Sequence, residues 1–179
     1  MGSTSQALAF LVGTFIHLYL VILLLRILLE YARADFYNPV CQVLIILTDP
    51  LCKPLGRLLP RTRRVNLAAL ILLYLVQLAG LFLLGLIQGF MPDPFIAALQ
   101  AVRELVRLLL VTYIVLIFAS VILSWVGQGF RHPIVPLIYQ LTDPVLAPIR
   151  RRLPSLGGFD LSPLLALIGL QFLIILLGV

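Results

Sequence analysis

Few residues of this chain could do chemistry, and their spacing does not assemble a catalytic group. The 179 residues include seven Asp and Glu, and no two of these lie at a spacing that suggests acid/base work. The sequence motifs of phosphate loops, serine hydrolases, zinc proteases and redox thiols are absent. The two cysteines, Cys41 and Cys52, come without companion histidines, so free thiols are the expectation. We predict a protein that is not an enzyme and that binds no metal and no cofactor.

Three polar side chains lie within long apolar stretches, where such a group calls for a functional explanation. His17 could ligate haem, but the other histidine, His132, falls in a loop, so we favour a neutral His17 hydrogen-bonded between helices. Gln77 and Gln171 each lie near the middle of an apolar stretch. We expect both amides to hydrogen-bond neighbouring helices in a dry contact. The alternative is a polar constriction that passes water or an ion.

The elements that carry these residues are expected to be transmembrane helices. The chain is 62% hydrophobic and 11% charged, with a mean hydropathy of +1.15, whereas soluble domains carry roughly 25% charged residues. A helix needs about 20 mostly apolar residues to cross a bilayer. The segments that meet this length are about 7–29, 67–90, 105–126 and 161–179. The fold class is therefore an all-α membrane protein with four transmembrane helices, in a single membrane domain covering residues 1–179.

The distribution of positive charge predicts how these helices are oriented. Eleven of the thirteen Lys and Arg residues belong to the two long links or their edges, and the middle link holds the other two. Basic residues concentrate in cytoplasmic loops. We therefore place residues 30–66 and 127–160 in the cytoplasm and both termini outside. The net charge of +6 then suits anionic lipid headgroups, and nucleic acid is not an expected partner.

The sequence repeats itself. Thr48-Asp49-Pro50 recurs as Thr142-Asp143-Pro144, an offset of 94 residues. The same offset aligns further Pro, Arg, Tyr and Gln residues without a gap, among them Gln77 with Gln171. Each copy would contain a span, a cytoplasmic link and a second span, which returns the chain to its starting side. We predict two parallel two-helix repeats, about 7–90 and 101–179, related by an axis along the membrane normal.

The cytoplasmic links are apolar and proline-rich, and we expect short interfacial or re-entrant helices in them. In the first link, one helix should begin at Asn38 and Pro39 and a second at Asp49 and Pro50. Asn66 and Asp160 should cap the spans that follow the links. For Asp160 the alternative is an acidic site that faces Arg150 to Arg152.

The links also carry the basic residues that we expect to gather near the headgroups and to dock lipids or partner proteins. These residues are Arg57, Arg61, Arg63, Arg64, Arg150, Arg151 and Arg152.

The two Thr-Asp-Pro copies, the run from Pro148 to Pro154 and Asp160-Leu161-Ser162-Pro163 together resemble the YggT family of small bacterial membrane proteins. The resemblance covers the chain from about residue 10 onward. It implies a plasma-membrane protein without established catalysis, whose relatives are linked to osmotic or potassium stress, cell division and membrane cytochrome maturation. The first copy departs from the pattern, with Asn66 where the second copy has Asp160.

These observations favour a non-enzymatic membrane scaffold or assembly factor in the bacterial inner membrane. It would dock lipids or partner proteins through its Pro/Arg-rich cytoplasmic links. The alternative is a small channel or transporter component for ion and osmotic balance. The expected partners are anionic lipids and membrane or cytoplasmic proteins, with a homo-oligomer left open.

Overall fold

A computed structural model of the chain describes residues 3–58, 66–126, 132–152 and 160–179. Its helices are α1 (Ser3–Tyr31), α2 (Pro39–Leu58), α3 (Leu67–Gln88), α4 (Pro94–Val126), α5 (Ile134–Arg150) and α6 (Ser162–Leu177). The described part of the chain contains no strand. The all-helical prediction is confirmed.

Three helices are long and apolar enough to cross a membrane, namely Ser3–Tyr31, Leu67–Gln88 and Pro94–Trp125. The last apolar helix, α6, has only 16 residues. The predicted span at 161–179 thus corresponds to a helix shorter than the three others, and four membrane spans are not confirmed. Conversely, α4 begins near Pro94 rather than at the predicted residue 105, because Asp93 accepts hydrogen bonds from the amides of Phe95 and Ile96 and so caps the helix.

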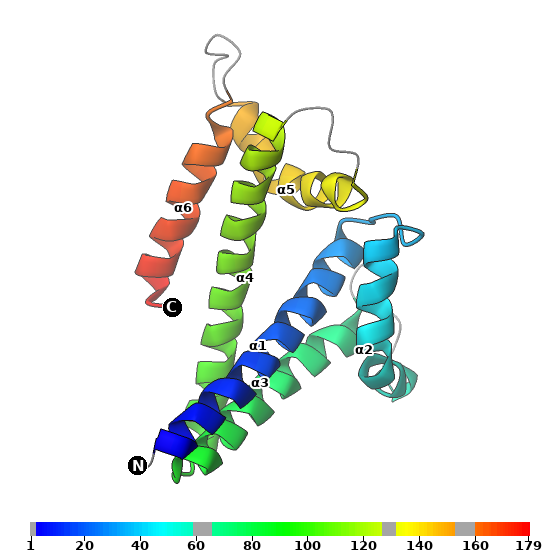
Figure 1. Cartoon of the computed structure of the whole chain (residues 1–179). Coiled ribbons are helices and arrows are strands. Elements are labelled where there is room, and N and C mark those ends of the chain that lie inside the picture. The colour runs from blue at the N-terminus through cyan, green and yellow to red at the C-terminus, as the bar shows by residue number, and fades with distance from the viewer. Residues whose placement is uncertain (1–2, 59–65, 127–131, 153–159) are drawn as a thin grey trace.

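The helices form two groups that pack in the same way (Figure 1). In the first group α1 lies against α3, and α2 contacts both. In the second group α4 lies against α6, and α5 contacts both. The groups are joined mainly where α3 packs against α4. Helices α1, α3 and α4 expose many large apolar side chains, which suits a lipid environment.

The core of each group uses residues that lie 94 positions apart. Leu23, Cys52 and Leu72 are buried where α1, α2 and α3 meet. The core of the second group consists of Ile117, Leu146 and Ala166, from α4, α5 and α6. Each of these three is the counterpart of one residue in the first set at the offset of the Thr-Asp-Pro motif.

Helix α2 is one continuous helix, although two separate helices were predicted. Asn38 caps its start by accepting a hydrogen bond from the Val40 amide at 2.9 Å, as expected. Pro50 and Pro54 lie inside the helix rather than at a new start. Proline removes a backbone hydrogen bond and bends a helix, and α2 changes direction along its length (Figure 1).

Helix ends are set by left-handed residues at several points. Gly89 and Gly178 close α3 and α6 with φ of 80° and 61°. Arg33 follows α1 with φ of 53°, and the Ala34 amide donates to the Leu29 carbonyl beside it. A side chain at positive φ costs roughly 1 kcal/mol, so the turn after α1 carries strain that glycine would relieve.

Candidate functional site

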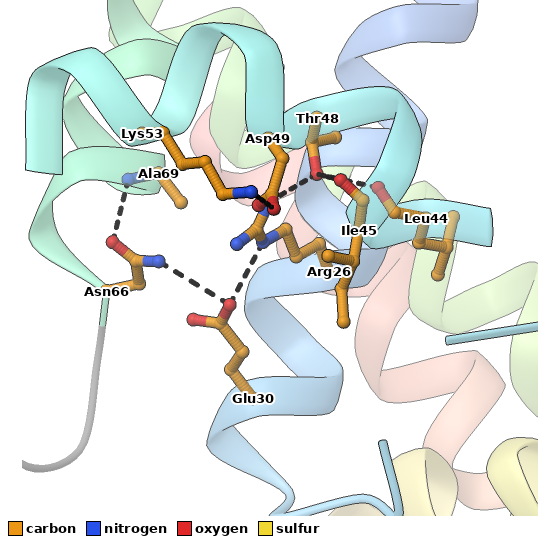
Figure 2. Close-up of polar contacts among 9 residues, drawn as sticks. All are labelled: Arg26, Glu30, Leu44, Ile45, Thr48, Asp49, Lys53, Asn66 and Ala69. Atoms are coloured by element: carbon orange, nitrogen blue, oxygen red, sulfur yellow. Dashed lines mark hydrogen bonds and ion pairs between the residues drawn. The ribbon is translucent and has the colours of Figure 1, made fainter. Parts of the chain in front are cut away.

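The most specific polar arrangement surrounds Arg26, near the cytoplasmic end predicted for α1. Arg26 is buried, with 8% of its surface exposed. Its Nε donates to Glu30 Oε1 at 3.0 Å, and its Nη1 donates to Asp49 Oδ1 at 2.8 Å. Nη1 also donates to the hydroxyl of Thr48, so one guanidinium binds side chains of α1 and α2 (Figure 2). Burial of a cation is tolerated only when it is paired and hydrogen-bonded in this way.

The helix period explains why these groups meet. Residues four apart lie on the same helix face, which places Glu30 beside Arg26 on α1 and Lys53 beside Asp49 on α2. Lys53 Nζ lies 2.8 Å from Asp49 Oδ2, so two cations bind that carboxylate. Burial raises the pKa of Asp49, but the hydrogen bonds from Lys53 and Arg26 outweigh it and hold the pKa below its usual value.

Asn66 extends the network to α3. Its side-chain oxygen accepts from the Ala69 amide and caps α3 as predicted, and its side-chain nitrogen lies 3.5 Å from Glu30 Oε1. The network thus contains two acidic and two basic side chains, so its net charge is zero, and it lies where α1, α2 and α3 meet (Figure 2). The network fixes α2 across the end of the α1/α3 pair.

The threonines of both Thr-Asp-Pro motifs are fully buried. Thr48 donates to the Leu44 carbonyl at 2.6 Å, and Thr142 donates to the Ile138 carbonyl at 2.9 Å. Both bonds run back to residue i−4, which satisfies a hydroxyl that would otherwise be costly to bury. The motif therefore folds in the same way in α2 and α5.

The second group holds α5 with different residues. The counterpart of Arg26 is Ser120, whose hydroxyl donates to the Ile117 carbonyl of its own helix. Arg150 instead pairs with Asp160 at 2.8 Å. Asp160 also accepts hydrogen bonds from Ser162, and these with the Arg150 bond outweigh burial and hold its pKa below the usual value. The N-cap of α6 is Leu161 rather than the predicted Asp160. Asp160 lies one residue earlier, where it faces Arg150 as in the predicted alternative.

The predicted arginine cluster is divided between two places. Arg57 is exposed at the end of α2, whereas Arg150, Arg151 and Arg152 are exposed at the end of α5. These two helix ends lie apart (Figure 1), so the described arginines do not form one patch. Arg61, Arg63 and Arg64 lie outside the described residues.

The intramembrane polar residues do not make the contacts that we expected. Gln77 is half-buried on α3, and Gln171 is exposed on α6. His17 is exposed on α1. Within the described residues none of the three makes a hydrogen bond, so the interhelical bonds predicted for them are not found. Gln171 and His17 face away from the neighbouring helices, and Gln77 meets no hydrogen-bond partner on the helices beside α3 in the described ranges.

The two thiols of α2 are buried, which disfavours their reactive thiolate form. Cys41 and Cys52 are free and buried, and burial raises the pKa of each thiol. In the described ranges no group of three His, Cys, Asp or Glu residues could hold a metal ion. The arrangement can fix helices and present charge, and none of its groups is placed as a nucleophile beside a base.

Sequence reasoning placed Asn66 correctly as a helix cap, put Asp49 at a helix start although it lies inside α2, and missed the role of Arg26. We had counted Arg26 only as a basic residue flanking the first span. The available signal was its spacing of four from Glu30, which predicts a pair on one helix face. Its long-range partner Asp49 could not be found without knowing how α2 folds back on α1.

The fold and this network define a class of protein, namely an all-helical membrane protein whose linking helices are held across the ends of apolar helices. The family model described as CCB3/YggT matches residues 5–87 and 99–179. The chain belongs to the CCB3/YggT family. Its two matched segments begin 94 residues apart, which equals the offset of the predicted repeat.

Curated relatives support the same assignment. The chain is 39% identical over 160 residues to "Uncharacterized protein YggT" of Escherichia coli strain K12, an alignment that covers 89% of this chain and 83% of the relative. It is 40% identical over 179 residues to "Uncharacterized protein in proC 3'region" of Vibrio alginolyticus, with 97% and 94% covered. It is 33% identical over 166 residues to an "Uncharacterized protein" of Haemophilus influenzae, with 92% and 88% covered. No solved structure matches the chain.

Proposed function

We propose that this chain is a non-enzymatic scaffold or assembly factor of the bacterial inner membrane, which docks lipids or partner proteins on its cytoplasmic face. The observation that carries the proposal is the way the linking helices are fixed. Arg26 clamps α2 through Asp49, and the Arg150–Asp160 pair holds α5 against the start of α6. Rigid helices that end in exposed arginines suit a docking platform.

We further propose that α6 crosses the membrane as a fourth span. A helix of 16 residues is about 24 Å long, which is short for a hydrocarbon core of roughly 30 Å, but local thinning accommodates such a mismatch at modest cost. α6 packs beside α4 and ends at Gly178. Gly178 lines an open cleft of about 630 Å³ together with Arg103, Glu104 and Arg107 of α4. The charged part of α4 thus begins where α6 ends, as expected at a membrane boundary.

Two parallel repeats with both termini outside complete the proposal. The shared core positions, the two equally folded threonines and the two family matches support the duplication. The topology is tested by fusing alkaline phosphatase and a fluorescent protein separately to Val179. Active phosphatase is expected, and fluorescence without phosphatase activity would refute the assignment.

The scaffold function is tested by photo-crosslinking in native membranes. A photoreactive residue replaces Arg151 at the exposed end of α5, and the matched control replaces Phe118, which is 58% exposed on the apolar surface of α4. Discrete protein or anionic-lipid adducts are expected from position 151, while position 118 should label acyl chains. The same adducts from both positions would contradict a specific docking face.

A further inference from the structure

Asp143, in the second Thr-Asp-Pro motif, is an exposed carboxylate without a cation. No ion pair or hydrogen bond joins it to another residue in the portion of the chain that the structure describes. Its counterpart Asp49 is bound by two cations, Arg26 and Lys53. At the offset of 94 the positions of these cations hold Ser120 and Ala147, which carry no charge. The second motif therefore presents the same acid but lacks both of its intramolecular partners.

This difference does not come from the backbone of the motif. Thr142 is as buried as Thr48, and each hydroxyl bonds to the carbonyls three and four residues before it. Thr142 is buried, whereas Asp143 beside it is exposed on α5. Only the carboxylate half of the motif is open to a partner.

The side chains exposed around the two motifs differ between α2 and α5. Around its motif α2 exposes the apolar side chains Val43, Ile46, Leu47 and Leu51. α5 exposes Tyr139 and Gln140 before Asp143, together with the apolar Ile134 and Pro136 nearer its start. An apolar face suits lipid, and an acid buried there must be neutralised within the chain. A polar face with an open acid suits contact with another polar surface.

Tyr139 and Asp143 have the chemistry that recognises arginine. They lie four residues apart and thus on one face of α5, and Tyr139 is 37% exposed. A guanidinium is planar, so it can stack on an aromatic ring while it donates hydrogen bonds to a carboxylate. The chain supplies the precedent itself, since Asp49 receives a guanidinium at 2.8 Å from Arg26, five residues before the end of α1.

We propose that Asp143, with Tyr139 beside it, binds an arginine near the cytoplasmic end of a transmembrane helix of a partner protein. The contact would reproduce the Arg26–Asp49 ion pair between two separate chains. This inference rests on the proposed scaffold function and specifies the chemistry of the partner. An anionic lipid is not the occupant, because its phosphate would be repelled by the carboxylate.

The test uses the full chain in lipid nanodiscs and a defined probe. The probe is a synthetic poly-leucine helix of about 20 residues with a single arginine near one end, and the matched probe carries glutamine at that position. Both peptides carry an acceptor dye, and binding is followed by energy transfer from a donor attached to the chain. The arginine probe should bind about twofold to fivefold tighter than the glutamine probe, which is the factor that a partly exposed ion pair contributes.

Three variants decide whether Asp143 is responsible. Asp143→Asn should abolish the preference for arginine. Ala147→Lys should also abolish it, because a lysine four residues after the acid would pair with it as Lys53 pairs with Asp49. Ala147→Gln is the control and should keep the preference. If Asp143→Asn fails to fold, the comparison of the two Ala147 variants still decides.

Several results would overturn the inference. One is equal binding of the two probes, and another is a preference that survives both Asp143→Asn and Ala147→Lys. A preference that disappears when phosphatidylethanolamine replaces phosphatidylcholine would assign the site to lipid amines instead. If crosslinks at Arg151 persist while the arginine preference is absent, only this inference fails. If those crosslinks are absent as well, the scaffold function fails with it.

Discussion

Removing the Arg26 side chain is the sharpest perturbation of the clamp between α1 and α2. In an Arg26→Met variant, Asp49 keeps Lys53 at 2.8 Å, whereas Glu30 keeps only the Asn66 amide at 3.5 Å. Breaking a buried pair by removing one partner costs about 3–5 kcal/mol. The carboxylates are 18% and 20% exposed and one retains a cation, so we expect the free energy of unfolding to fall by about 2–3 kcal/mol.

The measurement is the thermal unfolding of the purified protein in detergent, followed by helical circular dichroism. For a chain of this size about 1 kcal/mol corresponds to 2–4 °C in Tm, so a decrease of roughly 4–12 °C is expected. Arg57→Met is the matched control. Arg57 is exposed and has no ion pair in the described segments, so its loss should change stability by less than about 0.5 kcal/mol.

A second check asks which carboxylate is left without a cation in the Arg26→Met variant. In the Arg26→Met background, Glu30→Gln should restore more stability than Asp49→Asn, because Asp49 is still paired with Lys53 while Glu30 is not. The reasoning would be refuted by an Arg26→Met protein that unfolds within about 0.5 kcal/mol of the parent. It would also be refuted if Asp49→Asn restored more stability than Glu30→Gln.

Other perturbations test separate parts of the structure. Because the pKa values of Asp49 and Asp160 are lowered in the folded protein, their contribution to the free energy of unfolding is present above the ordinary aspartate pKa and is lost as the pH falls through the lowered values. If the parent protein and an Asp49→Asn/Asp160→Asn variant unfold at the same acid pH, this linkage is excluded. Asn66→Ala should lower stability by about 1 kcal/mol through loss of the α3 cap, and Asn66→Ser should largely retain it because serine caps without placing a charge beside Glu30; equal losses in a denaturant titration would argue against capping. Arg33→Gly should raise Tm by removing roughly 1 kcal/mol of left-handed strain, whereas Arg33→Ala should not, and the same Tm for both would disprove the strain. Gln171→Leu should leave liposome ion flux unchanged and stability equal or higher, since this exposed amide makes no hydrogen bond within the described ranges; a parent flux that the substitution abolishes would favour a channel.

Local sequence signals predicted the helices well and their lateral partners poorly. The length of the apolar stretches predicted the ends of α1 and α3 to within a few residues. Asn38 and Asn66 marked helix starts, because capping depends on neighbouring residues alone. Asp93 and Pro94 carried the same kind of signal for α4. We set the start too late because the charges from Arg103 onward were interpreted as a loop. Arg103, Glu104 and Arg107 instead lie within α4 and line an open cleft. Charged residues therefore do not by themselves mark the end of a helix.

The glutamines show why a repeat does not by itself predict a contact. Symmetry placed Gln77 and Gln171 about a common axis, and that argument assumes that the two helix pairs pack against each other through α3 and α6. The pairs are joined through α3 and α4 instead, so Gln171 lies on an outer surface. Which helices meet between repeats depends on the joining segment, and periodicity within a repeat carries no information about it.

The two halves retain one backbone plan and solve the same electrostatic problem differently. Each linking helix carries a buried threonine followed by an acid, and that acid must be neutralised, solvated or bound. In α2 the outer face is apolar, and Arg26 and Lys53 neutralise Asp49 within the chain. In α5 those cations are replaced by serine and alanine, and Asp143 is left on a polar face. A duplicated motif that served packing alone would be expected to keep or lose its acid together with its cation. The proposed partner site accounts for an acid that stands without its cation, and the contrast between Ala147→Lys and Ala147→Gln tests that account directly.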